Sequence, residues 1–306
     1  MMKNWLFAII ALFVVVLAAC SSSNEEKDTA NSGVGSDTIT YTTSKGEEIE
    51  VPKDPKRVVV LYGFVGTLKT FGVPTVGADA WSMQNPEFDE YLKDAIEVSN
   101  EEIEKIVELE PDLILGLDTV ENADKLKEIA PTVLFTYGEY SYLDQIVEVG
   151  KVINKEQEAK DWVADFEKRA VETGKEIKAK IGADATVSVI ENFNKQIYVY
   201  GENWGRGTEL LYQAMELEMP AKVKETALEP GYYALSSEVI ADFAGDYLIV
   251  SKFEEQDNSF MDTAAFKNIP AVKDGKMIVV DANRFYFNDA YTLDYQLNVF
   301  RKAFLE

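Results

Sequence analysis

The stretch KEQEAKDWVADFEKRAVETGKEIKAKI, residues Lys155–Ile181, separates two halves of this chain. Its apolar residues recur at helical spacing among Glu, Lys and Asp, and they include Trp162, Phe166, Ala170 and Ile177. This spacing predicts one long helix. At about 1.5 Å per residue the helix would extend roughly 40 Å, more than one small domain needs to cover its core. The pattern therefore predicts a strut that joins two lobes.

The two halves share a short pattern. In the first half Glu104 lies at the start of a helical segment, and Asp112, eight residues later, opens an apolar strand. In the second half Glu238 and Asp246 have the same spacing and the same setting. The recurrence indicates two lobes of related architecture. A match this short also arises by chance, so the repeat is a hypothesis for the structure to test.

The first residues have the pattern of an export signal. Lys3 precedes an apolar run from Trp5 to Val16, which is too short to span a membrane comfortably. The run ends in Leu-Ala-Ala-Cys, which resembles the lipobox of bacterial lipoproteins and implies a lipid anchor at Cys20. The alternative is an ordinary secretory peptide beside an incidental cysteine. We expect a lipoprotein signal peptide over residues 1–19, a flexible tether over 20–38, and a location on the extracellular face of the cell membrane.

Composition excludes several functional classes. The 306 residues include 30 Lys and Arg against 54 Asp and Glu, so the net charge is −24 and a nucleic-acid partner is excluded. The sequence has no histidine, which excludes a Ser-His-Asp triad, a histidine metal cage and a haem receptor with a histidine axial ligand. An enzyme would have to use carboxylates, lysine or tyrosine. A carboxylate-dependent surface hydrolase therefore stays open as a distant alternative.

Short apolar runs alternate with helical segments along the rest of the chain. After a predicted hairpin over 39–51, the runs with strand character are 57–61, 74–78, 113–115, 133–135, 186–190, 197–200, 247–250 and 277–280. Continuous apolar runs of this kind are typical of strands covered on both faces. We predict an α/β fold with an N-terminal lobe (39–154) and a C-terminal lobe (182–306), each a mainly parallel sheet flanked by helices, joined by the helix 155–181.

Loops that follow parallel strands line the ligand crevice of such sheets. This rule places three aromatic residues on the rim of a crevice, namely Tyr62, Phe64 and Trp81. The alternative for each is a ring folded back into a local core. Both interpretations stay open at this stage.

The segment Lys195–Met215, KQIYVYGENWGRGTELLYQAM, is the most informative one for function. Tyr198 shares a strand face with the tyrosine two residues later, and Trp204 and Arg206 follow on a glycine-bearing loop. The loop lacks the Lys-Ser/Thr ending of a phosphate-binding loop and a complete dinucleotide fingerprint. Aromatic surfaces beside one forked arginine suit a bulky, mostly neutral ligand with exposed oxygen atoms.

At these residues the chain resembles a known family. Residues 198–207, YVYGENWGRG, resemble the carboxyl-lobe motif of iron(III)-hydroxamate siderophore-binding lipoproteins of Gram-positive bacteria, and residues 288–294, NDAYTLD, resemble a second motif of that family. The resemblance implies the class III periplasmic-binding-protein fold with a rigid linking helix and little hinge closure. It also implies a monomeric substrate-binding component of an ABC importer, which is not an enzyme.

The resemblance also implies roles for individual residues. In the C-terminal lobe it makes Tyr198, Trp204 and Arg206 siderophore contacts, and in the N-terminal lobe it makes Tyr137 one. Tyr286 stands where relatives often have tryptophan, so its contact stays open. Iron arrives wrapped in the siderophore, so neither a protein metal ligand nor a cofactor is implied.

Glu104 and Glu238 match the two glutamates that dock onto arginines of the permease dimer in this family. The alternative is a solvated first-turn acid, which the helix dipole favours by only about 0.3–1 kcal/mol. The sequence alone does not decide between these roles.

The charges of the predicted site help to distinguish between classes of ferric siderophore. A ferric tris-catecholate carries about three negative charges and requires several cations, whereas the motif offers Arg206 and, nearby, Arg284. Ferric hydroxamates are neutral or singly positive and suit an acidic, aromatic cleft. A receptor for catecholate or citrate-type chelates is the alternative, and the choice between ferrichrome-like and ferrioxamine-like hydroxamates stays open.

Overall fold

The structure, a computed structural model, describes residues 37–306. The predicted signal peptide, Cys20 and nearly all of the predicted tether lie outside the described residues. Among the described residues, no helix combines the length and apolar character needed to cross a membrane.

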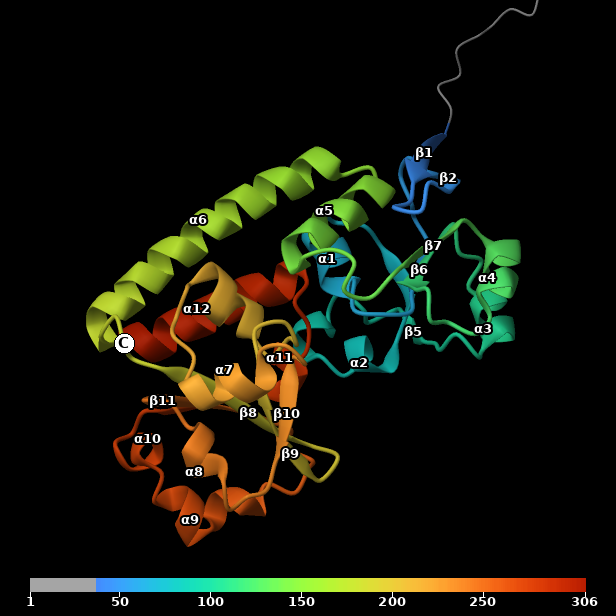
Figure 1. Cartoon of the computed structure of the whole chain (residues 1–306). Helices are drawn as coiled ribbons and strands as arrows, with labels where there is room; N and C mark the ends of the chain where they lie inside the picture. The colour runs from blue at the N-terminus through green and yellow to red at the C-terminus, as the bar shows by residue number, and fades with distance from the viewer. Residues whose placement is uncertain (1–36) are drawn as a thin grey trace, which may run out of the picture. The chain divides into compact units, whose positions relative to one another are not determined.

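The predicted long helix is present as α6 (Glu156–Ile181), which runs along one side of the molecule beside α5 and α12 (Figure 1). Phe166, Ala170 and Ile177 are fully buried on its inner face. Trp162 stacks on Phe166 with ring centroids 5.0 Å apart, and its Nε1 donates to Asp294 of α12 at 3.1 Å. The apolar stripe read from the sequence thus packs α6 onto the lobes.

The N-terminal lobe is built on a five-stranded parallel sheet of order β5-β4-β3-β6-β7. Its strands are β3 (Val58–Val60), β4 (Thr75–Ala78), β5 (Ile96–Glu97), β6 (Leu113–Leu117) and β7 (Thr132–Phe135). Its helices are α1 (Val65–Thr70), α2 (Ala80–Met83), η1 (Pro86–Phe88), α3 (Ile103–Glu108), α4 (Ala123–Ile129) and α5 (Tyr142–Val152). An antiparallel hairpin of β1 (Thr38–Thr42) and β2 (Glu48–Pro52) precedes them, as the sequence predicts.

The C-terminal lobe has a five-stranded sheet of order β10-β9-β8-β11-β12. Its strands are β8 (Val187–Phe193), β9 (Gln196–Tyr200), β10 (Tyr232–Leu235), β11 (Tyr247–Lys252) and β12 (Met277–Asp281). Its helices are the π-helical η2 (Glu209–Ala214), α7 (Ala221–Ala227), α8 (Ile240–Phe243), η3 (Ser259–Asp262), α9 (Ala264–Lys267), α10 (Pro270–Lys273), α11 (Ala282–Phe285) and α12 (Ala290–Leu305).

This second sheet is mixed, because β9 runs antiparallel to both neighbours. The cause is local: Asn194 and Lys195 alone connect β8 to β9, with φ of +51° and +68°. Two residues with positive φ form the tight turn of a hairpin, which forces the strands to be antiparallel. The other four strands share one direction, so the predicted α/β architecture of two lobes is confirmed.

The internal repeat is visible in both sheets. Each has its first strand at the centre, its second and third strands on one side, and its fourth and fifth strands on the other. Asp112, ahead of β6, accepts the backbone N–H of Arg57 at 2.9 Å, and Asp246, ahead of β11, accepts that of Thr186 at 2.8 Å. The two aspartates therefore tie together the two central strands of their lobes in the same way.

Contacts other than α6 also join the lobes. The Arg284 guanidinium pairs with Glu87 of the N-terminal lobe and with Asp281 at 3.1 Å. Gly66 of α1 lies so close to Asp289 that an added Cβ would stand 1.8 Å from Asp289 Oδ1. Glycine at this position lets the starts of α1 and α12 meet.

Candidate functional site

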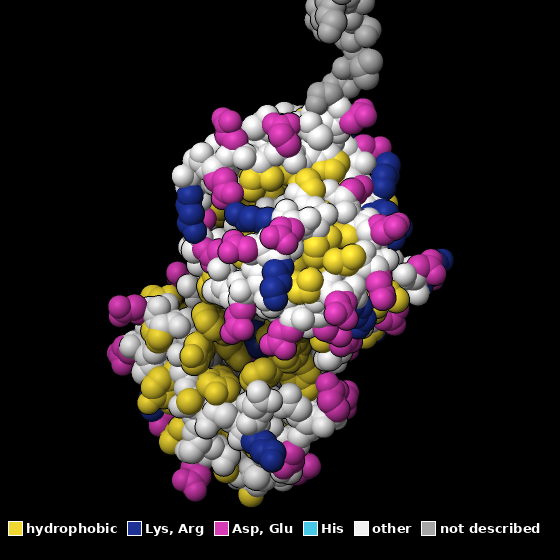
Figure 2. Space-filling view, turned by 90° about the vertical axis from the view of Figure 1, so that its right-hand side faces the viewer, with side chains coloured by type: hydrophobic (Ala, Val, Ile, Leu, Met, Phe, Trp, Pro, Cys, Tyr) yellow, Lys and Arg dark blue, Asp and Glu magenta, His cyan; other side chains and the backbone are white. Residues whose placement is uncertain are grey.

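A cavity of about 770 Å³ lies between the lobes. The space-filling view shows a hollow surrounded by hydrophobic side chains, with acidic side chains on its upper margin (Figure 2). Both lobes contribute aromatic rings to the lining, which are Tyr62, Phe64, Tyr137, Tyr140, Tyr142, Trp204, Tyr286 and Phe287. A cavity of this volume with an aromatic wall fits an organic ligand of several hundred daltons.

The loop after β9 brings Trp204 and Arg206 to the cavity. Gly205, Arg206 and Gly207 all have positive φ, at +69°, +59° and +82°. A Cβ on Gly205 would stand 2.4 Å from the carbonyl oxygen of Tyr286, so only glycine permits this approach. The Arg206 N–H donates to the Phe285 carbonyl at 2.8 Å. The glycines thus let a strained loop seat its arginine against the C-terminal segment.

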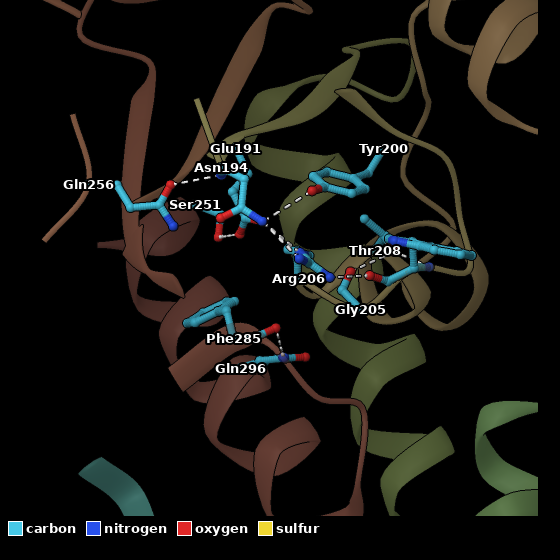
Figure 3. Close-up of polar contacts among 11 residues, drawn as sticks. Glu191, Asn194, Tyr200, Gly205, Arg206, Thr208, Ser251, Gln256, Phe285 and Gln296 are labelled. Carbon is cyan, nitrogen blue, oxygen red and sulfur yellow. Dashed lines mark hydrogen bonds and ion pairs between the residues drawn. The ribbon is translucent and has the colours of Figure 1, made fainter. Parts of the chain in front are cut away.

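The Arg206 side chain is paired with a buried carboxylate that the sequence analysis missed. Arg206 Nε and Nη2 donate to Glu191 Oε1 at 3.0 and 2.8 Å, and the exposed fractions of the two side chains are 7% and 0% (Figure 3). Tyr200 Oη donates to Glu191 Oε1 at 3.1 Å, and Ser251 Oγ donates to Oε2 at 2.5 Å. Glu191 therefore anchors the arginine and is itself fully hydrogen-bonded.

Two aromatic rings flank the guanidinium, with centroids 4.9 Å (Tyr200) and 4.5 Å (Tyr286) from Arg206 Cζ. Burial opposes the charge of Arg206, but the Glu191 carboxylate more than offsets it, so the pKa of the guanidinium is raised. Nη1 donates to the Trp204 carbonyl at 3.1 Å. These three bonds leave one further N–H group on Nη1 and one on Nη2, and the Tyr286 hydroxyl is an additional hydrogen-bond partner of the Arg206 side chain.

Two further carboxylates at the cavity are almost completely buried. Glu209 accepts the Gly205 N–H and the Asn288 amide, each at 3.0 Å, and Asp289 accepts the Thr292 N–H at 2.9 Å. Burial raises the pKa of Glu209, and burial raises the pKa of Asp289 to about 6. At neutral pH Asp289 is therefore mostly ionised and adds negative charge to the cavity.

Five of the seven predicted ligand contacts line the cavity, namely Phe64, Tyr137, Trp204, Arg206 and Tyr286. Trp81 is not among the lining residues. It crosses between the lobes and stacks on Tyr286, with ring centroids 4.6 Å apart and planes 4° from parallel. Tyr198 does not line the cavity either, and packs edge-on against Tyr232 at 5.6 Å. Trp81 thus contacts the lining residue Tyr286, and Tyr198 contacts Tyr232, which itself lies beside Trp204.

Arg284, considered from the sequence as a second cation of the site, is not among the cavity-lining residues. Its guanidinium forms ion pairs with Glu87 and Asp281, as described above. Within residues 37–306, no group of three or more acidic or cysteine side chains is arranged to hold a metal ion.

The two glutamates of the internal repeat lie on the surface. Glu104 is exposed in the first turn of α3, and Glu238 is exposed immediately before α8. They occupy equivalent places in the two lobes, between the third and fourth strands of each sheet.

Glu191 could have been found from the sequence. It lies within the apolar run TVSVIENF, and a charged residue inside a strand buried on both faces needs a partner of opposite charge. No such rule finds Asp289 or Glu209, because Asp289 is buried against Gly66 of the other lobe, and Glu209 is bonded to Gly205 and Asn288, which come from separate segments.

Comparison with known proteins supports the sequence resemblance. The model of the family described as "Periplasmic binding protein" matches residues 57–283. The iron(3+)-hydroxamate-binding protein FhuD of Bacillus subtilis (strain 168) is 35% identical over 294 residues, which cover 94% of this chain and 92% of that protein.

Solved structures agree with this match. The FhuD protein from S. pseudintermedius has a TM-score of 0.78 and 39% identity, and the match covers 88% of this chain and 98% of that one. FhuD2 from Staphylococcus aureus with bound ferrioxamine B has a TM-score of 0.78 and 34% identity, with 82% and 98% covered.

Proposed function

Because this chain belongs to the periplasmic binding protein family, we propose that it binds ferric hydroxamate siderophores in the interlobe cavity and delivers them to an ABC importer for iron uptake. The observation that carries the proposal is the Arg206 guanidinium, which Glu191 holds at the aromatic cavity and whose Nη1 and Nη2 atoms each carry one N–H group beyond those bonded to Glu191 and Trp204. Those donors suit the iron-bound oxygens of a hydroxamate. The proposal assigns no catalytic step to the chain.

The charge of the cavity favours hydroxamates over catecholates. Arg206 is the only cation among the lining residues of the described chain, and Glu191 already neutralises it. A ferric tris-catecholate with about three negative charges would meet Glu209 and Asp289 with no free cation to compensate. A neutral or singly positive ferric hydroxamate meets no such repulsion.

Delivery requires contact with a permease and a place at the membrane. We assign these to the exposed pair Glu104 and Glu238, one per lobe, and to a lipid at Cys20 on the extracellular side. Two carboxylates at equivalent places in two lobes suit a permease dimer that offers one arginine per subunit. Replacing both with alanine should abolish siderophore-dependent iron uptake by cells while the purified protein still binds the siderophore.

A fluorescence titration of the mature chain in detergent tests the binding step. The probes are ferrioxamine B, ferrichrome, a ferric catecholate and haem, and a bound iron chelate near Trp204 should quench its emission. Submicromolar quenching by a hydroxamate, with much weaker quenching by the catecholate and haem, is expected. Tight binding of the catecholate alone would replace the ligand class, and no binding of any probe would refute the proposal.

A further inference from the structure

The cavity carries more negative charge than a neutral ligand needs. Three carboxylates line it, Glu139 from the N-terminal lobe and Glu209 and Asp289 from the C-terminal lobe. No lysine is among its lining residues in the part of the chain that the structure describes, and the charge of Arg206 is balanced by Glu191. The lining therefore has three acidic side chains and no basic side chain without an acidic partner.

Asp289 also has an unused acceptor. Its Oδ2 is buried without a hydrogen-bond partner among residues 37–306, and the residue is only 4% exposed. The carboxylate lies against Gly66 at the start of α1, so Asp289 acts on the cavity through its charge rather than by direct contact with a ligand.

The acidic residues of the two lobes act on the same space. Burial and then the charge of Glu209 raise the pKa of Tyr137, which lies two residues before Glu139 on the loop between β7 and α5. The Tyr137 ring meets Trp204 edge-on at 5.9 Å, so that loop faces the C-terminal wall directly. The loop that carries Glu139 therefore faces the wall that carries Glu209.

On the premise of the function proposed above, we propose that Glu139, Glu209 and Asp289 make the cavity select ferric hydroxamates that carry a free ammonium group over otherwise identical neutral ones. A ferric trihydroxamate core has no net charge, so a pendant ammonium makes the whole complex singly positive. Negative potential focused in a cleft with low-dielectric walls attracts such a ligand. The aromatic wall binds the organic shell of both forms alike.

A matched pair of ligands isolates the charge. Ferrioxamine B is a ferric trihydroxamate that ends in a primary ammonium, and its N-acetylated form is neutral with almost the same shape. At about 20 mM salt the ammonium form should bind about fivefold tighter to the mature chain. The ratio should fall towards one at about 500 mM salt, where the screening length is only a few ångströms.

Substitutions test the assignment to these residues. Glu139→Gln should reduce the affinity ratio between the two ligands at low salt, and combining it with Glu209→Gln should reduce it further. Glu172→Gln is the matched control, because it removes the same charge from an exposed position on α6 and should leave the ratio unchanged. Circular dichroism checks that the variant with Glu209 replaced keeps its fold.

The outcomes separate this inference from the proposed function. Equal affinities for the two ligands at low salt, or tighter binding of the neutral form, would refute charge selection while hydroxamate binding stands. If Glu172→Gln changes the affinity ratio as much as Glu139→Gln does, selection depends on the net charge of the protein rather than on the cavity. This result would also refute the inference. Failure of both ligands to bind would refute the proposed function itself.

Discussion

The two walls of the cavity come from lobes with the same strand order, yet they differ in polarity. The N-terminal wall carries several rings, such as Phe64 and Tyr137, and its one charged lining residue, Glu139, is exposed. The C-terminal wall holds Arg206, Glu209 and Asp289, all buried. One copy of the fold thus supplies apolar surface, and the other supplies fixed charges that orient a ligand.

The difference begins in the central strands. β3 in the N-terminal lobe is a run of three buried valines, whereas β8 carries Glu191 inside its buried run. A carboxylate at that place requires Arg206, Tyr200 and Ser251 as partners. Related folds can therefore diverge in function through one charged residue in a central strand, provided that its partners accompany it.

Among the substitutions considered, removal of Glu191 should destabilise the C-terminal wall of the cavity most. Glu191→Ala leaves the Arg206 charge buried without a carboxylate, and we expect a loss of about 3–5 kcal/mol in the free energy of unfolding, measured by urea denaturation. The double variant Glu191→Leu with Arg206→Met removes both charges and should recover most of that loss. A double variant as unstable as the single one would contradict the pairing.

The next effect concerns the point where the walls meet. In Gly66→Ala the new Cβ would stand 1.8 Å from Asp289 Oδ1, so the starts of α1 and α12 must move apart. We expect a loss of about 2 kcal/mol in the free energy of unfolding. Gly46→Ala, at a position with open space but a φ of +79°, should lose about 1 kcal/mol through backbone strain, a cost that Gly66→Ala does not carry because the φ of Gly66 is not positive. Wild-type stability of Gly66→Ala would show that the lobes are not held together here.

A substitution that alters only the contact with the ligand should have a smaller effect than the two above. Arg206→Lys keeps a positive charge beside Glu191 but loses the forked donors, so the affinity for a ferric hydroxamate should fall about tenfold. Arg206→Ala is a poorer test, because it also leaves Glu191 buried without a cation. If the lysine variant has wild-type affinity in a fluorescence titration, a positive charge at this position is sufficient for ligand binding and the forked donors are not needed.

The smallest effect is expected on the N-terminal wall. Tyr137 is half-exposed and offers a ring edge to Trp204, so Tyr137→Ala should weaken ferric hydroxamate binding by about threefold. Tyr137→Phe keeps the ring and serves as the control. A greater loss from Tyr137→Ala than from Arg206→Lys, measured by the same titration, would reverse the assignment of roles to the two walls.

Much of the fold could be predicted because its elements carry strong local patterns. Continuous apolar runs located the buried strands, and the stripe through Phe166 and Ile177 located α6. The antiparallel direction of β9 was not predicted, although the two-residue connection Asn194-Lys195 encodes it. Apolar runs show where strands lie but not how they are directed, which depends on the connection.

The site was predictable only in part. The loop with Trp204 and Arg206 is encoded locally by its glycines, whereas the places of Trp81 and Arg284 depend on contacts between the lobes. Both were assigned from their position along the chain. Such contacts join residues about 200 positions apart, and the periodicity of apolar residues does not predict contacts between distant segments.

The position of α12 after both sheets in the chain affects the order of folding. Its sixteen residues are made after every strand of both sheets, yet they pack against both α6 and α1. Domains fold in the order in which they are synthesised, so both sheets can form before this helix arrives. A chain cut short before residue 290 would thus keep its strands and expose the apolar faces that α12 covers. Chaperones and proteases recognise exposed apolar surfaces, so they would distinguish shortened copies from copies that carry α12.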